Sequence, residues 1–425
     1  MSFDSLGLSP ALLRALHERG HAAPTPIQAE AIPAALQGRD LQAQAPTGSG
    51  KTVAFSLPLL MQAQRHAQPG GHALLGLVLV PTRELAEQVG TVLQELARPL
   101  QPRLRIAVLF GGVSINPQLM GLRGGADIVV ATPGRLLDVV GHNALRLSTV
   151  QTLVLDEADR LLDLGFAEEL ARILDLLPRR RQNLCFSATY PAAVQALVAG
   201  LLHEPLRIEL PAEAEARPAI EQRAIEVDAA RRTPLLRHLI EQHGWPRLLV
   251  FVATQYATEH VAEKLQRAGI AAAALHGQQA QGRRRMVLGD FRAGRVRVLV
   301  ATDLAARGLD VVGLPAVLNY DLPRAAADYT HRIGRTGRAG ETGVAVSFVT
   351  PESEGHFRLI EKRQQQRVPR ERIAGFEPDP ALAPAQPVSP DGGGIKGRRK
   401  SRKDKAREAA AADAAASAAD PAPKA

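Results

Sequence analysis

A glycine-rich octapeptide, residues 45–52, has the composition of a loop that binds nucleotide phosphates. It reads Ala45-Pro46-Thr47-Gly48-Ser49-Gly50-Lys51-Thr52, the G-x-x-x-x-G-K-[ST] pattern with alanine at its first position. Gly48 and Gly50 let backbone N–H groups approach phosphate oxygens with no Cβ atom between them. Lys51 would reach the β- and γ-phosphates, and the Thr52 hydroxyl would ligate Mg²⁺. The alternative is a Gly/Ser turn that happens to contain Lys-Thr.

Two adjacent carboxylates, Asp156 and Glu157, follow an apolar segment well downstream of this loop. In nucleotide hydrolases, one such carboxylate holds Mg²⁺, usually through water, and the other orients or deprotonates the attacking water. An isolated Asp-Glu pair is more often a solvated turn. Its place after a predicted strand, downstream of a phosphate loop, favours catalysis with Asp156 at the metal and Glu157 at the water.

Arginines recur at every third position between His331 and Arg338. Arg332, Arg335 and Arg338 are too close together for a stable exposed structure without anionic partners. We predict that Arg335 and Arg338 reach the γ-phosphate as arginine fingers, which supply roughly 10³–10⁵ in rate in other phosphoryl-transfer enzymes. Because Lys51 lies in the first half of the chain, hydrolysis would require both halves to close on the nucleotide.

Short apolar segments alternate with helical patterns, as in an α/β protein whose parallel sheets are buried on both faces. The expected strands cover residues 77–80, 106–110, 127–131, 152–155 and 184–186, and then 248–252, 271–275, 296–300 and 316–320. Helices are expected at residues 9–20 and 255–268. The polar motifs directly follow these strands, and ligands of open α/β sheets bind at that carboxyl edge.

Length and composition indicate an ordinary globular protein. The chain has 425 residues, 45% hydrophobic and 22% charged, which suggests two or three domains. It has no long apolar run typical of a membrane span, and we expect neither a secretory signal nor a membrane partner. The single cysteine, Cys185, excludes an internal disulfide and a cysteine-based zinc site and is expected to be buried filler. Together these features predict a cytoplasmic protein.

Of the net charge of +9, +4 lies on residues 390–425, which carry nine basic and five acidic groups, so the rest of the chain is only mildly basic. The segment from Lys396 to Arg407 holds eight basic residues and one acidic residue. Residues 380–425 are too poor in apolar side chains to offset the entropy of an ordered chain, so we predict disorder. Two interpretations stay open for this tail: a solvated end, or a tether that raises the local concentration of nucleic acid.

Taken together, the motifs resemble those of DEAD-box RNA helicases of superfamily 2, and most closely the bacterial RhlE group. The matching segments are Pro24-Thr25-Pro26-Ile27-Gln28, Thr47 to Thr52, Pro81-Thr82-Arg83-Glu84-Leu85-Ala86, Gly111-Gly112, Thr132 to Arg135, Asp156-Glu157-Ala158-Asp159, Ser187-Ala188-Thr189, Ala301 to Asp310 and His331 to Arg338. The stretches Phe110 to Pro117 and Gly375 to Pro380 also resemble RhlE proteins.

The resemblance implies an α/β fold of two tandem RecA-like parallel-sheet domains joined by a short linker, with a disordered basic C-terminal tail. On this basis the N-terminal ATP-binding domain is expected at residues 1–208 and the linker at 209–222. The C-terminal helicase domain is expected at residues 223–379 and the tail at 380–425.

The resemblance also implies a role for each matching residue. ATP and Mg²⁺ are the expected cofactors, with Gln28 at the adenine and Asp310 at the ribose. Cofactor contacts are expected from Phe3, Gln28, Thr47, Gly48, Ser49, Gly50, Lys51, Thr52 and Asp310. Catalytic roles fall to Lys51, Asp156, Glu157, Arg335 and Arg338. RNA contacts fall to Pro81, Thr82, Arg83, Gly112, Thr132, Arg135 and Thr302. Coupling between the two sites falls to Asp159, Ser187, Thr189 and His331.

Two departures from the family pattern stand out. His21 occupies the position where the family usually stacks Phe or Tyr on adenine, which predicts slightly weaker ATP binding. The segment Val252-Ala253-Thr254-Gln255 lacks an arginine often found there. That absence puts one contact of domain closure or of RNA in question.

The implied function is RNA-stimulated hydrolysis of ATP to ADP and phosphate. It would drive a two-domain clamp that locally unwinds short RNA duplexes or remodels RNA–protein complexes. Structured RNA, read with little sequence specificity, is the expected partner, and ribosomal precursors or RNA-decay proteins are further candidates. The alternatives are an ATP-dependent RNA clamp that acts as a scaffold, and a DNA translocase.

Overall fold

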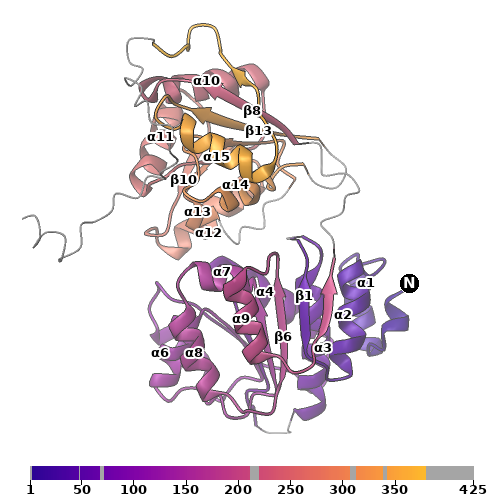
Figure 1. Ribbon diagram of the computed structural model, residues 1–425. Helices are drawn as coiled ribbons and strands as arrows, with labels where there is room; N and C mark the ends of the chain where they lie inside the picture. Colours follow the sequence, from indigo (N-terminus) through magenta and orange to yellow (C-terminus); the bar gives the residue numbers. More distant parts are fainter. Residues whose placement is uncertain are drawn as a thin grey trace, which may run out of the picture. The chain divides into compact units, whose positions relative to one another are not determined.

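The computed structural model describes residues 2–46, 48–67, 71–210, 220–306, 313–337 and 342–379 (Figure 1). These residues form two α/β units, each built on a seven-stranded sheet whose strands all pair in parallel. The predicted fold class of two tandem parallel-sheet domains is therefore confirmed. Thr47, Asp310, Arg338 and the predicted tail lie outside the described residues.

The first sheet has the strand order β3-β4-β2-β5-β6-β1-β7. Its strands are β1 (Leu41–Gln44), β2 (Gly76–Leu79), β3 (Ile106–Leu109), β4 (Ile128–Ala131), β5 (Thr152–Asp156), β6 (Gln182–Ser187) and β7 (Leu206–Glu209). The residues of β2, β4, β5 and β6 are buried throughout, as expected for central parallel strands covered on both faces. The five strands predicted in this half are confirmed, whereas β1 and β7 were missed.

The elements outside this sheet are the 3₁₀ helix η1 (Phe3–Leu6) and nine α-helices among the described residues. These are α1 (Pro10–Glu18), α2 (Pro26–Leu36), α3 (Lys51–His66), α4 (Arg83–Ala97), α5 (Asn116–Gly121), α6 (Pro133–Gly141), α7 (Ala158–Asp163), α8 (Ala167–Leu176) and α9 (Ala192–Leu201). The predicted start of α1 is confirmed, because the Ser9 hydroxyl accepts a hydrogen bond from the Leu12 N–H at 3.4 Å and Pro10 follows the cap.

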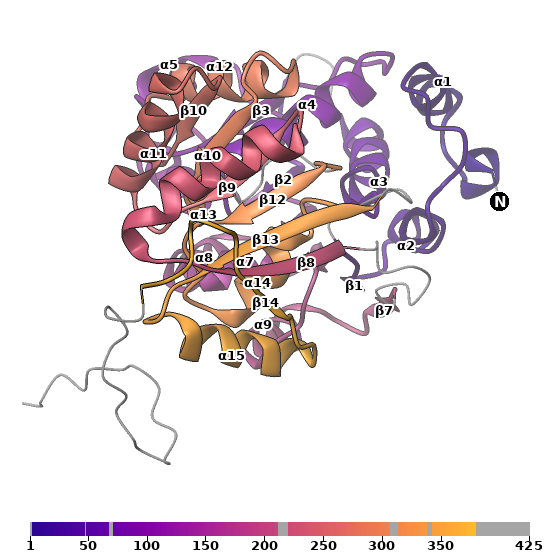
Figure 2. The ribbon, with the colours of Figure 1, turned by 90° about the horizontal axis from the view of Figure 1, so that it is seen from above.

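The second sheet has the strand order β10-β11-β9-β12-β13-β8-β14, and Figure 2 shows β9, β12, β13 and β8 side by side. Its strands are β8 (Ile220–Glu226), β9 (Leu248–Phe251), β10 (Ala272–Leu275), β11 (Val298–Ala301), β12 (Ala316–Asn319), β13 (Gly343–Val349) and β14 (Arg370–Glu371). Its helices are η2 (Ala229–Arg231), α10 (Arg232–His243), α11 (Gln255–Arg267), α12 (Gln281–Arg292), α13 (Asp303–Ala306), α14 (Ala326–Ile333) and α15 (Glu354–Gln364).

The predicted linker, residues 209–222, lies between the two sheets in sequence. Glu209 ends β7, and β8 begins at Ile220. The linker residues 211–219 lie outside the described part of the chain, so the linker remains a prediction.

Each sheet carries two hydrophobic clusters of buried side chains. Cys185, on β6, is fully buried among the apolar residues of one of them, which confirms its predicted role as filler. Burial raises the pKa of the Cys185 thiol to about 12, so this sulfur is unreactive in the folded protein. No helix in the described ranges combines the length and apolarity that crossing a bilayer requires.

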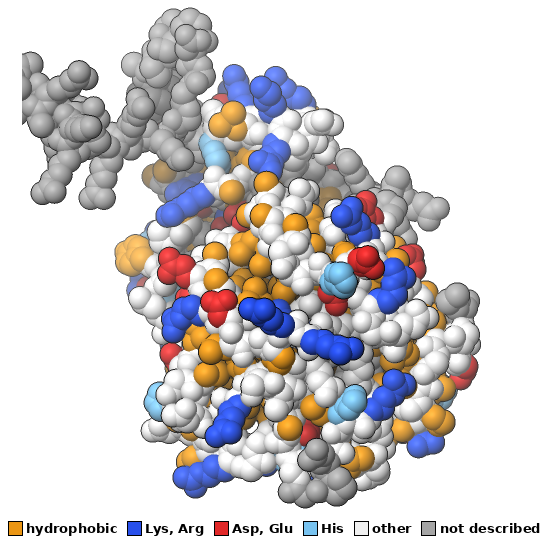
Figure 3. All heavy atoms as spheres, turned by 60° about the horizontal axis from the view of Figure 1, so that its bottom comes forward, with side chains coloured by type: hydrophobic (Ala, Val, Ile, Leu, Met, Phe, Trp, Pro, Cys, Tyr) orange, Lys and Arg blue, Asp and Glu red, His pale blue; other side chains and the backbone are white. Residues whose placement is uncertain are grey.

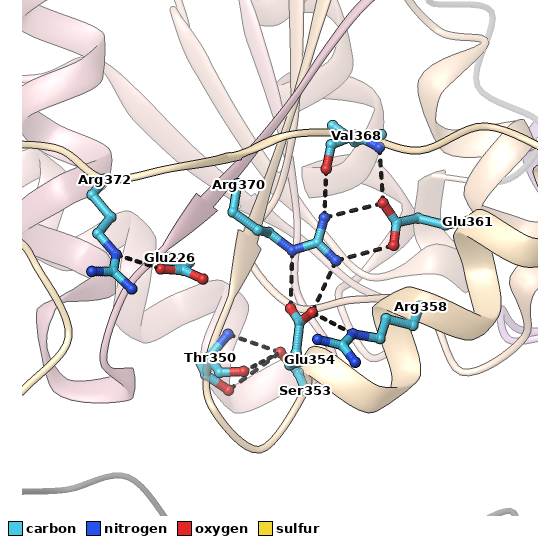
Figure 4. Close-up of polar contacts among 9 residues, drawn as sticks. All are labelled: Glu226, Thr350, Ser353, Glu354, Arg358, Glu361, Val368, Arg370 and Arg372. Atoms are coloured by element: carbon cyan, nitrogen blue, oxygen red, sulfur yellow. Dashed lines mark hydrogen bonds and ion pairs between the residues drawn. The ribbon is translucent and has the colours of Figure 1, made fainter. Parts of the chain in front are cut away.

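The last described segment is tied to the second unit by Arg370 (Figure 4). Its guanidinium donates to Glu354 at 3.0 and 3.1 Å, to Glu361 at 3.1 and 3.0 Å, and to the Val368 carbonyl at 2.6 Å. The guanidinium carbon also lies 4.7 Å from the centre of the Phe357 ring. One side chain thus joins the short strand β14 to the helix α15.

We predict that Arg370→Ala lowers the free energy of unfolding of the second unit by about 2 kcal/mol, between the values for exposed and buried ion pairs. The chain contains one tryptophan, Trp245, which is buried in this unit, so its fluorescence during urea unfolding reports on this unit. Arg372→Ala is the matched control, because Arg372 makes a 2.6 Å ion pair with Glu226 but is 69% exposed. Equal midpoints for the two variants would contradict the assignment.

Candidate active site

The predicted functional residues of the first half fall into two groups at the carboxyl edge of its sheet. The phosphate loop follows β1, Asp156 to Asp159 lie at the end of β5, and Ser187 to Thr189 end β6. Pro81 to Arg83 follow β2, Gly112 follows β3, and Thr132 to Arg135 follow β4. Because the strand order is β3-β4-β2-β5-β6-β1, each group occupies three neighbouring strands. One group has the residues of a phosphate site, and the other has the predicted RNA contacts.

The described part of the phosphate loop is held by the start of α2. The Thr25 hydroxyl donates to the Ser49 carbonyl at 2.8 Å, and the Gln28 amide donates to the Gly50 carbonyl at 3.2 Å. Gly50 has a φ of +94°, and a Cβ atom there would lie 2.5 Å from Gln28 Nε2. The loop therefore needs glycine at this position both for its backbone conformation and for the close approach of α2.

The lysine of the loop is buried and bound to the loop itself. Lys51 is 7% exposed, and its Nζ donates to the Ala45 carbonyl at 2.7 Å and to the Pro46 carbonyl at 3.4 Å. Helix α3 begins at Lys51, so its first N–H groups and the positive end of its dipole lie beside the loop. Gly48 and Ser49 lie in the same turn, and Thr52 follows on α3, partly exposed.

Two of the predicted nucleotide contacts, Gln28 and Phe3, are both buried. Gln28 is 2% exposed, and its Oε1 accepts from the Thr25 N–H at 2.9 Å. With these two bonds made, the amide keeps one donor and one acceptor position, as pairing with adenine requires. Phe3 is 5% exposed and packs in the first hydrophobic cluster. Burial, and then the charge of Arg19, lower the pKa of His21, so its ring is neutral at pH 7.

Three acidic side chains are buried where β5 ends: Asp156, Glu157 and Asp159 are 3%, 7% and 5% exposed. Burial raises the pKa of Asp156 to about 7, the charge of Lys51 acts in the opposite direction, and Glu157 adds to the increase. Glu157 has φ +52° and ψ +53°, a left-handed conformation that is rare outside glycine and common at functional sites.

This carboxylate pair fits a divalent cation. The Oε2 atom of Glu157 is buried without a hydrogen-bond partner among the described residues, and its neighbour Asp156 pays a desolvation cost that a cation would relieve. Within the described ranges no cluster of three or more His, Cys, Asp or Glu residues offers a protein-only metal cage. Mg²⁺ would suit such a site, because it keeps several waters and takes only one or two protein ligands; Asp156 and Thr52 are the predicted ones.

Asp159 joins the ends of β5 and β6. Its Oδ2 accepts from the Thr189 N–H at 3.0 Å and from the Thr189 hydroxyl at 2.7 Å, and its own N–H donates to the Ser187 hydroxyl at 3.2 Å. The Ser187 hydroxyl in turn donates to the Thr189 carbonyl at 2.7 Å. Three of the four predicted coupling residues are thus brought together.

The fourth predicted coupling residue, His331, contacts Arg160, a residue that was not predicted from the sequence. Arg160 Nη1 lies 3.4 Å from Glu157 Oε2, and its Nη2 lies 3.4 Å from Nδ1 of His331. Burial, and then the charge of Arg160, lower the pKa of His331, so the ring is neutral and its Nδ1 can accept. The sequence could have predicted the ion pair of Arg160 with Glu157, because the two residues are three positions apart at the start of a short helix.

The arginines of α14 and the turn after it have different surroundings. Arg332 is 3% exposed and makes a two-point ion pair with Asp303 at 2.5 and 2.6 Å. This is the anionic partner that the sequence required, and it makes Arg332 structural. Arg335 is 5% exposed and lines a small hollow together with Arg160 and His331.

In the second group of edge residues, Arg83 and Gly112 touch, although they follow different strands. Gly112 has a φ of +74°, and a Cβ atom on it would overlap the guanidinium of Arg83. Thr82 caps α4 by accepting from the Leu85 N–H at 3.3 Å, and Pro81 is buried beside it. Arg83 is only partly buried, so its charge stays available at the edge.

Thr132 and Arg135 complete this group. The Thr132 hydroxyl accepts from the Gly111 N–H at 3.4 Å. Arg135 is 7% exposed and donates from Nη2 to the Val113 carbonyl at 2.7 Å, whereas its Nη1 is buried without a hydrogen-bond partner among the described residues. An unsatisfied guanidinium donor suits a phosphate oxygen. The seventh predicted RNA residue, Thr302, follows β11 of the second sheet and is partly exposed.

Further contacts that the sequence reading missed join α4 to α12. Arg284 is 3% exposed and donates to Glu84 Oε1 at 2.8 and 2.6 Å. Gln281 donates to Glu87 at 3.3 Å, and Arg285 also pairs with Glu87. No local pattern could indicate these pairs, because about two hundred residues separate the partners in sequence.

The surface charge is dispersed on the face shown in Figure 3. Lys and Arg side chains there are scattered among acidic, hydrophobic and uncharged groups rather than gathered into one field. The charge on this face therefore does not indicate that it binds an anionic polymer. The hydrogen-bond donors at the sheet edge are the stronger evidence for RNA contacts.

We predict that Asp156→Asn stabilises the protein without nucleotide or metal more at pH 8 than at pH 5. The folded state raises the pKa of this carboxyl from 3.8 to about 7, so the wild-type protein loses stability as the pH rises through that window. Asparagine carries no charge and escapes this loss. Thermal midpoints in a chelator at the two pH values measure the effect, with exposed Asp175→Asn as control. A difference independent of pH would refute the prediction.

Comparison with known proteins agrees with this geometry. Residues 25–197 match the DEAD/DEAH box helicase family, and residues 231–340 match the helicase conserved C-terminal domain. The chain is 42% identical over 369 residues to the DEAD-box ATP-dependent RNA helicase CshA of Bacillus cereus, covering 87% of this chain and 69% of that protein. The CshA of Bacillus subtilis is 37% identical over 370 residues, covering 87% and 74%.

A solved structure of Dbp5 from S. cerevisiae, bound to RNA and ADP BeF3, is similar at 32% identity and a TM-score of 0.75. The match covers 88% of this chain and 95% of that one. Both the sequence and the arrangement of the two RecA-like sheets therefore lead to one assignment: this chain belongs to the DEAD/DEAH box helicase family.

Proposed function

We propose that this protein is an ATP-dependent RNA helicase whose RNA-stimulated hydrolysis of ATP drives closure and release of a two-domain clamp. The clamp separates short RNA duplexes locally or remodels RNA–protein complexes. The observation that carries this proposal is the hydrogen bonding of Asp159 to Ser187 and Thr189. These residues belong to the nucleotide group at the sheet edge, which lies next to the group of predicted RNA contacts. A change in one group would reach the other through these bonds.

For hydrolysis, the buried end of β5 supplies the proton acceptor. Glu157 is held in its left-handed turn. Its Oε2 lies 3.4 Å from Arg160 Nη1, makes no hydrogen bond among the described residues, and would take a proton from the attacking water. Lys51 would leave its loop carbonyls for the β- and γ-phosphates. Bound Mg²⁺ would neutralise phosphate charge, held by Thr52 and, through water, by Asp156. Arg335, with Arg338, would contact the γ-phosphate from the second domain.

For RNA, the second half of the edge supplies donors suited to the backbone. Arg83 and Arg135 offer guanidinium groups, Thr82 and Thr132 offer hydroxyls, and Gly112 lets the strand approach closely. Contacts of this kind reach phosphates and 2′-hydroxyls and carry little sequence information. Thr302 would contribute from the second domain, and His331 would pass the state of the nucleotide to this surface.

The finer parts of the proposal rest on the sequence. The stretches Phe110 to Pro117 and Gly375 to Pro380 favour an RhlE-like group within the family. Roles at the nucleotide for Phe3, Thr47 and Asp310 rest on their motif positions. A cytoplasmic location fits the one buried, unpaired cysteine. Ribosomal precursors and RNA-decay proteins are the partner classes we propose.

We predict that RNA stimulates ATP hydrolysis by the wild-type protein and that Glu157→Gln reduces the stimulated rate by at least roughly 100-fold, the lower range for loss of a general base. ATP binding should persist, because glutamine keeps the size of the side chain. The control is Asp163→Asn, an exposed carboxyl at the end of the same helix. Phosphate release with and without RNA measures the rates.

Other outcomes of this experiment select the alternatives. ATP binding without stimulation by RNA would favour the scaffold clamp that does not hydrolyse ATP in response to RNA. Equal stimulation by DNA and RNA of the same length would favour a DNA translocase. Wild-type rates in Glu157→Gln would refute the assigned base.

A further inference from the structure

Tyr256 stands out on the surface of the second domain. It is 76% exposed, and among the described residues it is the one aromatic side chain in the group of exposed large hydrophobic residues. A single exposed hydrophobic residue needs no explanation by itself. The ring of Tyr256, however, stacks on the ring of His260 one helical turn later, with centroids 5.5 Å apart and planes at 14°. This backing orders a ring that would otherwise be free in solvent.

The position of Tyr256 places it at the carboxyl edge of the second sheet. It is the second residue of α11, which begins after β9 and is capped by the Thr254 hydroxyl. Strand β11, which ends before Thr302, lies between β9 and β10 in the sheet. The Val252 N–H donates to the Ala301 carbonyl at 3.0 Å, and the Thr302 N–H donates to the Leu275 carbonyl at 3.4 Å. The segments that follow these three strands are therefore neighbours.

The segment after β10 is hydrogen-bonded to α11, and two of the buried polar atoms in and after this segment lack hydrogen-bond partners. Glu259 of α11 pairs with His276 Nε2 at 2.9 Å and accepts from Gln279 at 3.3 Å. His276 is 8% exposed, yet its Nδ1 has no hydrogen-bond partner among the described residues, and the same holds for Oε1 of the buried Gln281. Buried polar atoms without partners are rare in folded proteins, and a ligand with polar groups at this edge would satisfy them.

Positive charge acts on Glu259, which lies between Tyr256 and His260 in the sequence of α11. Burial acts to raise the pKa of Glu259, but hydrogen bonds from His276 and Gln279 and the charge of Arg283 hold the pKa below its usual value. Arg283 itself is exposed at the start of α12. Proteins hold single-stranded nucleic acid with exposed aromatic rings on surfaces that also carry basic side chains.

We propose that Tyr256, backed by His260, stacks on an unpaired base of the RNA that crosses the edge beside Thr302. The inference rests on the proposed function and adds a contact to a base, in a clamp whose other predicted contacts reach the backbone. Stacking is tolerant of sequence, because every base has a π-face. Tyr256 also follows directly after the segment that lacks the arginine typical of this family. A ring at this position holds the strand without adding charge.

The test compares the affinities of Tyr256→Ala, Tyr256→Phe and the wild-type full chain for a labelled single-stranded RNA, in the presence of ADP and beryllium fluoride. We expect the alanine variant to bind roughly tenfold more weakly, within the range for one stacked base. The phenylalanine variant should bind like the wild type, because it keeps the ring. The slope of affinity against salt should stay unchanged in both, since no phosphate contact is removed.

A second arm identifies the base. In a series of RNAs that each lack one base, one position should weaken wild-type binding by the same factor and have no further effect on Tyr256→Ala. The control is Met286→Ala, which removes a similarly exposed side chain, 59% exposed on α12, and should bind normally. Trp245 fluorescence during urea unfolding checks that each variant is folded.

The outcomes separate this inference from the proposed function. Wild-type affinity in Tyr256→Ala, or equal loss in the alanine and phenylalanine variants, overturns the stacking contact while leaving the helicase proposal intact; a protein partner would then be the better occupant of this surface. A wild-type protein that binds no RNA overturns both.

Discussion

The structure depends on the burial of three carboxyl groups within four residues at the end of β5. Burying an acid without a partner is costly, and each of the three meets that cost differently. The Asp159 carboxylate is satisfied by hydrogen bonds from the N–H and the hydroxyl of Thr189, just after β6. Asp156 faces the charge of Lys51 and takes a raised pKa. Glu157 Oε2 lies 3.4 Å from Arg160 Nη1 but makes no hydrogen bond within the described part of the chain. The two groups whose burial is not fully compensated, Asp156 and Glu157, are the ones predicted to hold Mg²⁺ and to act on water.

The sheet order places this cluster next to both groups of predicted site residues. Strand β5 lies between β2, which leads to the predicted RNA contacts, and β6, which ends in Ser187. The segment after β5 therefore borders both halves of the edge. Arg160 extends the same cluster toward His331 of the second unit. We propose that small changes at the nucleotide reach both the predicted RNA half of the edge and the other domain by this route.

The sequence predicted the parts of this structure that have local signals. Continuous apolar runs revealed the central strands, and the phosphate loop and the Asp-Glu pair appeared as motifs. Strand β1 was missed because Leu41-Gln42-Ala43-Gln44 alternates instead of forming an apolar run, and β7 is a short edge strand. The bonds of Asp159 to Thr189 and of Arg284 to Glu84 join residues far apart in sequence. They depend on strand order and on tertiary packing, which no single segment encodes.

The most direct test of this account is the thermodynamic coupling between nucleotide and RNA in Thr189→Val. Valine keeps the shape and the backbone N–H bond to Asp159 but removes the hydroxyl bond of 2.7 Å. We predict that ADP with beryllium fluoride tightens RNA binding to the wild-type protein by roughly 5- to 150-fold, the usual range of allosteric coupling. In Thr189→Val the same ligand should tighten RNA binding by a much smaller factor. Each ligand alone should bind both proteins equally. Full coupling in Thr189→Val would contradict the account.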